Sequence, residues 1–221
     1  MTHLVQQDGV YVLDLGADEN RFTLDWLKQV DAHLDEVVAS PAPLVTTAGG
    51  KFYSNGLDLE YVLGNPEQLS AYVAEVQALF ARVLELPVPT VAAVPGHAFG
   101  AGAMLAMAHD WRVMRSERGY FCFPEVDINI PFTPGMAALI QAKLTPQGAI
   151  VAMSTGQRYD AGAAVAAGLV DSAAAEADVL PSAIARVQPL AGKDPGTLGA
   201  IKATMFAGVL RELRTPEVHG A

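Results

Sequence analysis

The sequence predicts an α/β layered domain followed by a helical C-terminal region. In the first part of the chain, short apolar segments of strand length alternate with segments of helical periodicity. That alternation is typical of a sheet covered by helices. In the last third the pattern is almost entirely helical, and three pairs match a helix cap followed by proline at the first helical position: Thr133-Pro134, Thr145-Pro146 and Asp194-Pro195.

The individual elements follow from spacing and from helix caps. Thr23 is expected to cap a helix that runs to about Val38, because apolar residues recur there at helical spacing. Asn65 and Pro66 are expected to begin a long helix that ends near Leu86. Further helices are predicted over 103–108 and 161–167, and strands over 9–15, 44–48, 90–94, 111–114 and 120–123.

Composition and charge narrow the classes of protein and partner. The chain has 221 residues, enough for a large core, and 51% of them are hydrophobic. Its formal net charge of −10 argues against nucleic acid or an anionic membrane as the main partner, but it permits a small anionic ligand. The single cysteine, Cys122, excludes an intrachain disulfide and a cysteine-based metal site, and it fits a reducing compartment.

Targeting signals are not evident in the sequence. No uninterrupted apolar run has the length of a membrane span, and the first residues lack a basic segment followed by an apolar core. The last three residues, 219–221, are not a peroxisomal signal of the Ser-Lys-Leu type. We therefore expect a cytoplasmic protein with no membrane segment.

A glycine-rich turn over 95–102 connects a buried strand to a buried helix. The start of a helix presents free N–H groups and the positive end of the helix dipole. Such a turn can bind phosphate or stabilise an oxyanion. The alternative is a close-packed crossover of glycine and alanine with no chemical role, and the turn alone leaves both interpretations open.

Two further segments carry candidate functional residues. The segment 51–59, Lys-Phe-Tyr-Ser-Asn-Gly-Leu-Asp-Leu, is predicted to be a loop just past the carboxyl end of a strand. Ligands of α/β sheets bind at that position. The segment Pro124-Glu125-Val126 follows a short aromatic strand, which would place the Glu125 carboxyl beside apolar groups and raise its pKa.

In their order and spacing, these three segments resemble the crotonase superfamily, also called the enoyl-CoA hydratase/isomerase superfamily. Two flanking passages match as well, at 154–157 and 166–170, so the resemblance covers about residues 8–172. It implies a spiral of ββα units over residues 1–172. It also implies a helical region over 173–221 that assembles the chain into a homotrimer or a dimer of trimers.

The resemblance also implies a substrate and a binding site. Family members bind an acyl-CoA thioester, so coenzyme A would be part of the substrate, with no separate cofactor and no metal. By position, the backbone amides of Leu57 and Ala101 would hold the thioester oxygen, and amides aimed in advance at a developing negative charge stabilise it. The same resemblance implies that the substrate-binding residues are Lys51, Phe52, Ser54, Asn55, Gly56 and Gly100. Lys51, then Arg21 and Lys202, are the candidates to contact the nucleotide of CoA.

The number of carboxylates decides which reaction the resemblance favours. Family hydratases are similar in carrying two catalytic glutamates, and here Glu125 matches one of them while Met104 occupies the position of the other. A thioether cannot exchange a proton. One glutamate is sufficient to move a proton from C2 to C4, so the pattern resembles a Δ3,Δ2-enoyl-CoA isomerase of fatty acid metabolism. The alternatives are a hydratase or thioester hydrolase assisted by Asp127, and an inactive CoA-ester binding protein.

Several polar residues near these segments receive structural interpretations. Asp127 lies two residues after Glu125, so on a strand the two would share a face, although a turn or cap is the more typical role. Asp58 is expected to cap a turn or helix. His97 and His109 are expected to be structural histidines, the latter at a helix end, and a contact with the ligand is the alternative role for His97.

Overall fold

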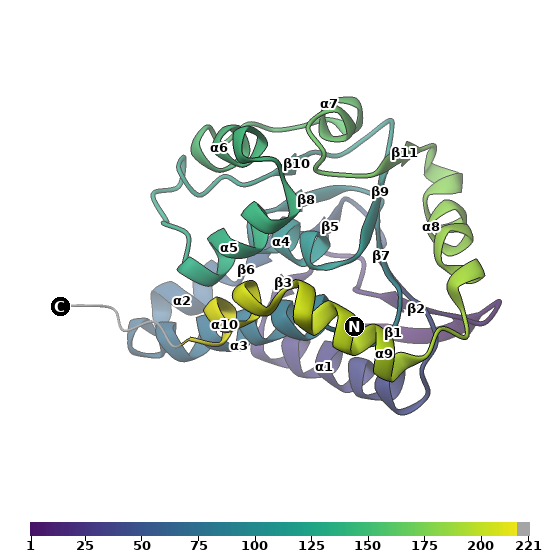
Figure 1. The fold of residues 1–221 in the computed structure, drawn as a ribbon. Coiled ribbons are helices and arrows are strands. Elements are labelled where there is room, and N and C mark those ends of the chain that lie inside the picture. The colour runs from purple at the N-terminus through teal and green to yellow at the C-terminus, as the bar shows by residue number, and fades with distance from the viewer. Residues whose placement is uncertain (216–221) are drawn as a thin grey trace.

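The computed structural model describes residues 1–215, and its largest sheet has six strands in the order β1–β2–β4–β7–β9–β11 (Figure 1). The β1–β2 pair is antiparallel, and all other pairs in this sheet are parallel. The strands are β1 His3–Gln7, β2 Val10–Asp14, β4 Leu44–Thr47, β7 Thr90–Val94, β9 Trp111–Arg115 and β11 Ser172–Ala174.

Two smaller sheets lie beside the large one. The first has the order β10–β8–β5, with β10 Phe121–Cys122, β8 His97–Phe99 and β5 Phe52–Ser54, and the second pairs β3 Arg21–Phe22 with β6 Gly56–Leu57. Along the chain, a strand of the large sheet is repeatedly followed by a short strand of a small sheet and then by a helix. This repetition confirms the predicted spiral of ββα units.

Ten α-helices and three 3₁₀ turns complete the described part of the chain. The 3₁₀ turns are η1 Pro66–Gln68, η2 Glu176–Asp178 and η3 Gln188–Leu190. The α-helices are α1 Leu24–Ala39, α2 Leu59–Gly64, α3 Leu69–Leu84, α4 Ala101–Ala108, α5 Pro134–Lys143, α6 Pro146–Ser154, α7 Ala161–Ala166, α8 Val179–Val187, α9 Pro195–Met205 and α10 Ala207–Arg214.

Both faces of the large sheet are covered, and alternate strand residues belong to different cores. In β7, Val91 and Ala93 pack with α8, whereas Ala92 and Val94 belong to the larger core that contains α1, α3 and α4. This follows from the alternation of side chains along a strand, and it explains why β7 is an uninterrupted apolar segment. Figure 1 shows α8 beside β7 and β9, with α1 and α3 below the sheets.

The C-terminal helices extend across the body of the molecule (Figure 1). Helix α10 buries Leu210 and Leu213 and packs against α3 and α5. Arg214 of α10 pairs with Glu85 at the end of α3. Among residues 1–215, no helix is both long and apolar enough to cross a membrane. The predicted division at residue 172 and the role of the last helices in oligomerisation stay predictions.

The structure differs from the sequence prediction at short elements. Strand β1 was not predicted, because it is an exposed edge strand without an apolar alternation. The segment 51–59 was predicted to be a loop, but it contains β5 and β6, and Asp58 then caps the unpredicted helix α2 by accepting the Tyr61 N–H. The 95–102 turn contains β8. These elements of two to six residues are too short to produce a recognisable periodicity.

The three predicted cap–proline pairs are confirmed. Thr133, Thr145 and Asp194 each accept a backbone N–H with their side chain, from Met136, Gly148 and Thr197 respectively, and proline follows each cap. These caps satisfy N–H groups that a helix start leaves without partners.

We expect Thr145→Ala to lower the free energy of unfolding by about 1 kcal/mol, the usual cost of losing an N-cap side chain. Its Oγ1 accepts the Gly148 N–H at 3.1 Å, and no other element of the fold depends on this contact. Chemical denaturation compared with the exposed neighbour variant Gln147→Ala would measure the effect. Equal stability of the two variants would contradict the assigned cap.

Candidate active site

The segments that contain Leu57 and Ala101 meet at Gly56. A Cβ atom at position 56 would lie 2.9 Å from the Ala101 nitrogen and 2.9 Å from the Phe99 carbonyl oxygen. Gly56 also has a φ of +76°, a conformation that L side chains rarely adopt. Glycine at position 56 therefore allows the backbone of β6 to lie directly against the start of α4.

Ala101 is the first residue of α4, so its N–H has no acceptor within the helix. Gly100 precedes it with φ +52° and turns the chain sharply from β8 into the helix. The helix is buried along its whole length, and the positive end of its dipole lies at this turn. The turn thus has the two properties that stabilise a negative oxygen, a free amide and a favourable dipole.

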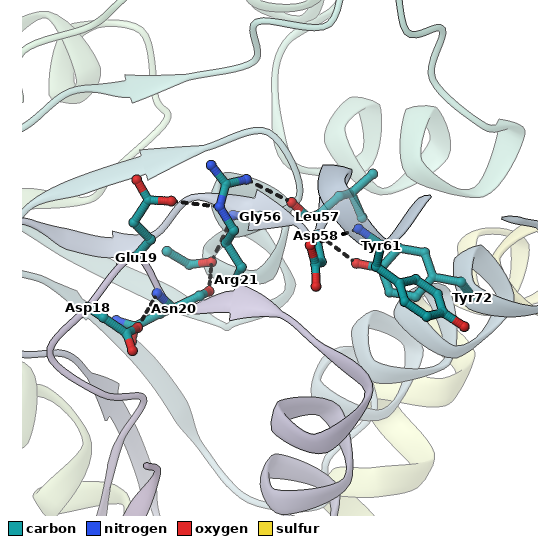
Figure 2. Close-up of polar contacts among 10 residues, drawn as sticks. Asp18, Glu19, Asn20, Arg21, Gly56, Leu57, Asp58, Tyr61 and Tyr72 are labelled. Carbon is teal, nitrogen blue, oxygen red and sulfur yellow. Dashed lines mark hydrogen bonds and ion pairs between the residues drawn. The ribbon is translucent and has the colours of Figure 1, made fainter. Parts of the chain in front are cut away.

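Leu57 is held in position through its own backbone. Arg21 donates from Nη1 to the Leu57 carbonyl oxygen at 3.1 Å, and its Nε donates to Glu19 at 2.6 Å. The preceding amide, that of Gly56, donates to Ser54 Oγ at 3.0 Å. Figure 2 shows these groups at one end of the β3–β6 pair (Figure 2). The contacts fix the orientation of the peptide planes around Leu57.

A second network, which the sequence did not predict, supports the same loop. Buried Asn20 has φ +48° and donates from Nδ2 to the carbonyls of Gly16, Phe52 and Tyr53. Tyr72 of α3 donates to the Phe22 carbonyl at 2.9 Å and accepts the Asp58 N–H at 2.8 Å, so it lies under both β3 and α2 (Figure 2). Asparagine tolerates positive φ better than most residues. This general preference was the only feature of the sequence that could have indicated the role of Asn20.

Glu125 is the carboxylate nearest to the turn at Gly100. It lies in a turn just after β10, is 8% exposed, and its Oε1 would be 3.2 Å from a Cβ at position 100. Among residues 1–215, its Oε2 is buried without a hydrogen-bond partner. Burial raises the pKa of Glu125 to about 7, because removal from water disfavours the charged form. A buried carboxylate with one free oxygen and a pKa near neutrality can accept and return a proton.

Met104 and Asp127 are the two positions at which a second catalytic carboxylate was considered. Met104, on α4, is 1% exposed and belongs to the main core. Asp127 is exposed, and its backbone closes a turn by donating to the Pro124 carbonyl at 2.9 Å. Its carboxylate lies against the backbone of Gly156. The turn expected as the more typical role of Asp127 is confirmed, and the alternative in which Asp127 shares a strand face with Glu125 does not occur, because the chain turns at this point.

The remaining loop residues divide into buried and accessible groups. Ser54 is fully buried, and its hydroxyl donates to the Asn20 carbonyl at 2.7 Å, so it holds the loop from within. Phe52 is half-buried beside His97 and Phe99, with the exposed Lys51 ammonium 5.2 Å from its ring. Asn55 is half-buried and donates its N–H to the Glu19 carbonyl. Lys51 is the accessible cation of this loop.

The histidines and Lys202 serve the framework. His97 accepts the Tyr120 N–H with Nδ1, and buried His109 hydrogen-bonds Thr46 and the Leu105 carbonyl, as expected of structural histidines. Lys202 is 4% exposed and bonded to Asp110 and the Val88 carbonyl, so the expectation that it contacts CoA is wrong. In the part of the chain that the structure describes, no three His, Cys, Asp or Glu side chains form a group that could hold a metal ion.

An apolar cavity of about 670 Å³ begins at Leu57 and continues between α2, α3 and the segment 130–136. Its few polar groups lie at one side, where Thr133 donates to Gln77 and where Glu212 and Thr215 come from the C-terminal end. Its apolar walls are formed by Leu57, Leu59, Val62, Leu63, Leu69, Val73, Ile130, Pro131, Phe132, Pro134 and Met136. Its volume and lining are those of a site for a small apolar group.

The parallel ββα spiral and the meeting of Leu57, Ala101 and Glu125 define a protein of the crotonase class. The model of the family described as "Enoyl-CoA hydratase/isomerase" matches residues 14–217, and the chain belongs to this family. The chain is 33% identical over 220 residues to "Enoyl-CoA delta isomerase 1, peroxisomal" of Arabidopsis thaliana, covering 96% of this chain and 91% of that protein.

Two solved structures illustrate the shared fold. The human mitochondrial delta3-delta2-enoyl-CoA isomerase superposes with a TM-score of 0.89 at 20% identity, over 96% of this chain and 85% of that one. The probable enoyl-CoA hydratase EchA3 of Mycobacterium tuberculosis H37Rv has a TM-score of 0.89 at 23% identity, over 97% and 92% of the two chains. One fold thus accommodates proteins named for either reaction, so the reaction must be argued from the site.

Proposed function

We propose that this protein is a Δ3,Δ2-enoyl-CoA isomerase in which Glu125 carries the proton. The observation that carries the proposal is the single buried carboxylate beside the Gly100 turn, combined with Met104 at the place of a second acid. The isomerase name of the Arabidopsis relative, which matches over nearly the whole chain, supports the same reaction.

In the proposed reaction, Glu125 removes a proton from C2 of a 3-enoyl-CoA, and the electrons move into the thioester carbonyl to give a dienolate. The amides of Leu57 and Ala101 hold the negative oxygen of that intermediate. The protonated Glu125 then returns the proton to C4, which leaves the double bond between C2 and C3. The apolar cavity that begins at Leu57 would receive the acyl chain. The exposed Lys51 stays the first candidate to contact the anionic groups of CoA, and Arg21 the second.

Hydration and thioester hydrolysis are the competing reactions, and both need a held and activated water. Neither Met104, which is buried in the core, nor Asp127, which lies against Gly156, offers a second base beside Glu125. The geometry therefore favours isomerisation over both alternatives. It also favours isomerisation over an inactive CoA-ester binding protein, in which an unpaired buried acid would lower stability and serve no purpose.

The test is incubation with a series of 3-enoyl-CoA esters in deuterated water, followed by chromatography and mass analysis. We expect 2-enoyl-CoA as the first product. Early 3-hydroxyacyl-CoA would establish a hydratase instead, and free CoA would establish a thioester hydrolase. Tight binding of every ester with no product would support the inactive binding protein and contradict the proposal.

The pH dependence of kcat/KM should follow the raised pKa of Glu125. Because a base must be ionised to accept a proton, kcat/KM is expected to fall about tenfold per pH unit below about 7 and to level off above it. Initial rates with 3-enoyl-CoA between pH 5 and 9 would measure the profile. A plateau that continues down to pH 5 would contradict the assigned base.

We further propose that the protein acts in the cytoplasm as a homotrimer or a dimer of trimers. The family likeness supports the assembly, and the single cysteine supports a reducing compartment. The named Arabidopsis relative is peroxisomal, so compartment is a property that varies within the family. Light scattering of the purified protein and imaging of a tagged chain would test the two proposals separately.

A further inference from the structure

A second cavity lies at the other end of helix α5 from the acyl cavity, along helix α9. Its volume is about 470 Å³, it is open to the surface, and it is bordered by the start of β9, the end of α5, the turn η3 and α9. Its walls are mainly apolar, and the side chains that form them are Trp111, Leu190, Leu198, Ile201, Met205 and Phe206.

Two of the cations that line this cavity, the half-buried Lys143 and the exposed Lys193, have no carboxylate partner within residues 1–215, and Lys143 is the one removed from water. Lys143, the last residue of α5, donates from Nζ to the His109 carbonyl at 3.1 Å and lies 4.6 Å from the centre of the Phe206 ring. It forms no ion pair with any carboxylate in residues 1–215. Burial lowers the pKa of Lys143 to about 8, so the ammonium is still largely charged at pH 7.

The charged groups around Lys143 are otherwise matched in pairs. Lys202 donates to Asp110 at 2.6 Å, and Asp110 also accepts the Thr90 N–H at 2.8 Å. Arg112 pairs with Asp171 at 3.0 Å. His109 is fully buried with its pKa lowered to about 4, so it is neutral at pH 7.

The cluster therefore contains three cations and two carboxylates, and the missing negative charge is beside Lys143. A buried charge without a partner is unfavourable, whereas a bound anion would compensate it. The Nε of Arg112, which donates from Nη1 to the same His109 carbonyl as Lys143, is buried and also lacks an acceptor in the described chain. Lys193 and Asp194 also line the cavity, both are exposed, and Asp194 already caps α9.

We propose that this cavity binds the anion of a fatty acid, with its carboxylate on Lys143 and its alkyl chain along Trp111 and α9. An apolar cavity with one convergent charged group is the usual form of a small-molecule site. Two exposed apolar residues of α9, Ile201 and Met205, would be covered by the chain of the ligand. This site is separate from the proposed isomerase site and does not depend on it.

Trp111 is the tryptophan that reports on the α9 cavity, because Trp26 lines neither of the two cavities. Trp111 lines the α9 cavity, whereas Trp26 is buried against Phe22, on the strand that pairs with β6 and Leu57. Titration of the full-length protein with a bromine-labelled decanoate, which quenches an indole that it contacts, should give saturable quenching. We expect Trp111→Phe to abolish this signal, because only Trp26 then remains.

The contribution of the Lys143 charge is tested with Lys143→Met, which keeps an unbranched side chain and removes the ammonium group. We expect its affinity for decanoate to fall about tenfold or more, the loss typical of one charge-assisted hydrogen bond. Lys28→Met, which removes an exposed lysine of α1, should bind as the wild type does. Because Ile201 is half exposed, Ile201→Glu should fold normally and also weaken binding by placing a negative charge on the cavity wall.

Three results would overturn the proposal. The first is that the wild type and Lys143→Met bind decanoate with equal affinity in calorimetry. The second is that bromine-labelled decanoate still quenches the fluorescence of Trp111→Phe with the affinity seen for the wild type. The third is Trp111 fluorescence that responds to protein concentration but not to decanoate, which would mean that a second copy of the chain occupies this cavity.

Discussion

Glu125→Gln is expected to reduce kcat for the isomerisation of a 3-enoyl-CoA by about 10²–10⁴-fold, the usual contribution of a positioned general base. Glutamine keeps the size of the side chain and its place beside Gly100, but it cannot accept a proton at the free oxygen. Affinity for the CoA ester should change little, so KM and kcat should separate. Turnover within a few-fold of the wild type would contradict the assignment of Glu125.

Asp127→Asn is the matched control, because it changes a carboxylate to an amide two residues away in the same turn. Its carboxylate lies against Gly156, so we expect activity near that of the wild type. A large loss in this variant, accompanied by product hydration in the wild type, would instead favour the two-carboxylate reaction.

Glu125→Gln should also make the protein more stable than the wild type at alkaline pH. The folded-state pKa of Glu125, about 7, lies above its ordinary value, so the folded chain holds this proton more tightly than the unfolded chain. Stability therefore declines as pH rises from about 4.5 to about 7 and is constant above, and at most about 3 kcal/mol is lost. Glu125→Gln removes this dependence, and chemical denaturation at pH 5 and pH 8 would measure it.

Sequence patterns predicted the elements that have a clear periodicity or a strong cap. Helix α1 and its Thr23 cap, the buried strand β7 and the caps at Thr133 and Thr145 all agree with expectation. The order and spacing of the segments 51–59, 95–102 and 124–126 were sufficient to predict the ββα spiral. Proteins of one family share a fold, and the fold sets the spacing of its loops along the chain. The prediction failed at β6 and β8, whose two or three residues have no period of their own.

The candidate site was predicted as separate segments, but not as a supported structure. Leu57, Ala101 and Glu125 were identified from motifs; in the structure Gly56 brings the backbones at Leu57 and Ala101 together, and the Glu125 carboxyl lies beside Gly100. The supporting residues Asn20 and Tyr72 were not predicted, because their partners lie up to 50 positions away along the chain. Long-range hydrogen bonds of this kind leave no pattern in the local sequence. The ion pair between the buried Lys202 and Asp110 leaves none either.

Ala101→Pro is expected to reduce kcat by about 10²–10³-fold, the effect of removing one donor from an oxyanion hole. The position is unusual in allowing this test, because Ala101 is the first residue of α4 and proline fits the first position of a helix. The substitution removes the N–H and leaves Glu125 unchanged. If the amide acts only in the transition state, kcat and kcat/KM should fall together.

Ala161→Pro provides the matched control, since Ala161 is likewise the first residue of a helix, α7, and is also buried. The residue before each proline differs: Asp160 is extended, as proline favours, whereas Gly100 has φ +52° and no Cβ to meet the proline ring. The control should keep both its thermal midpoint and its turnover. If Ala101→Pro folds with a similar midpoint and turns over 3-enoyl-CoA at the wild-type rate, the Ala101 amide does not stabilise the dienolate, and the oxyanion must be held elsewhere.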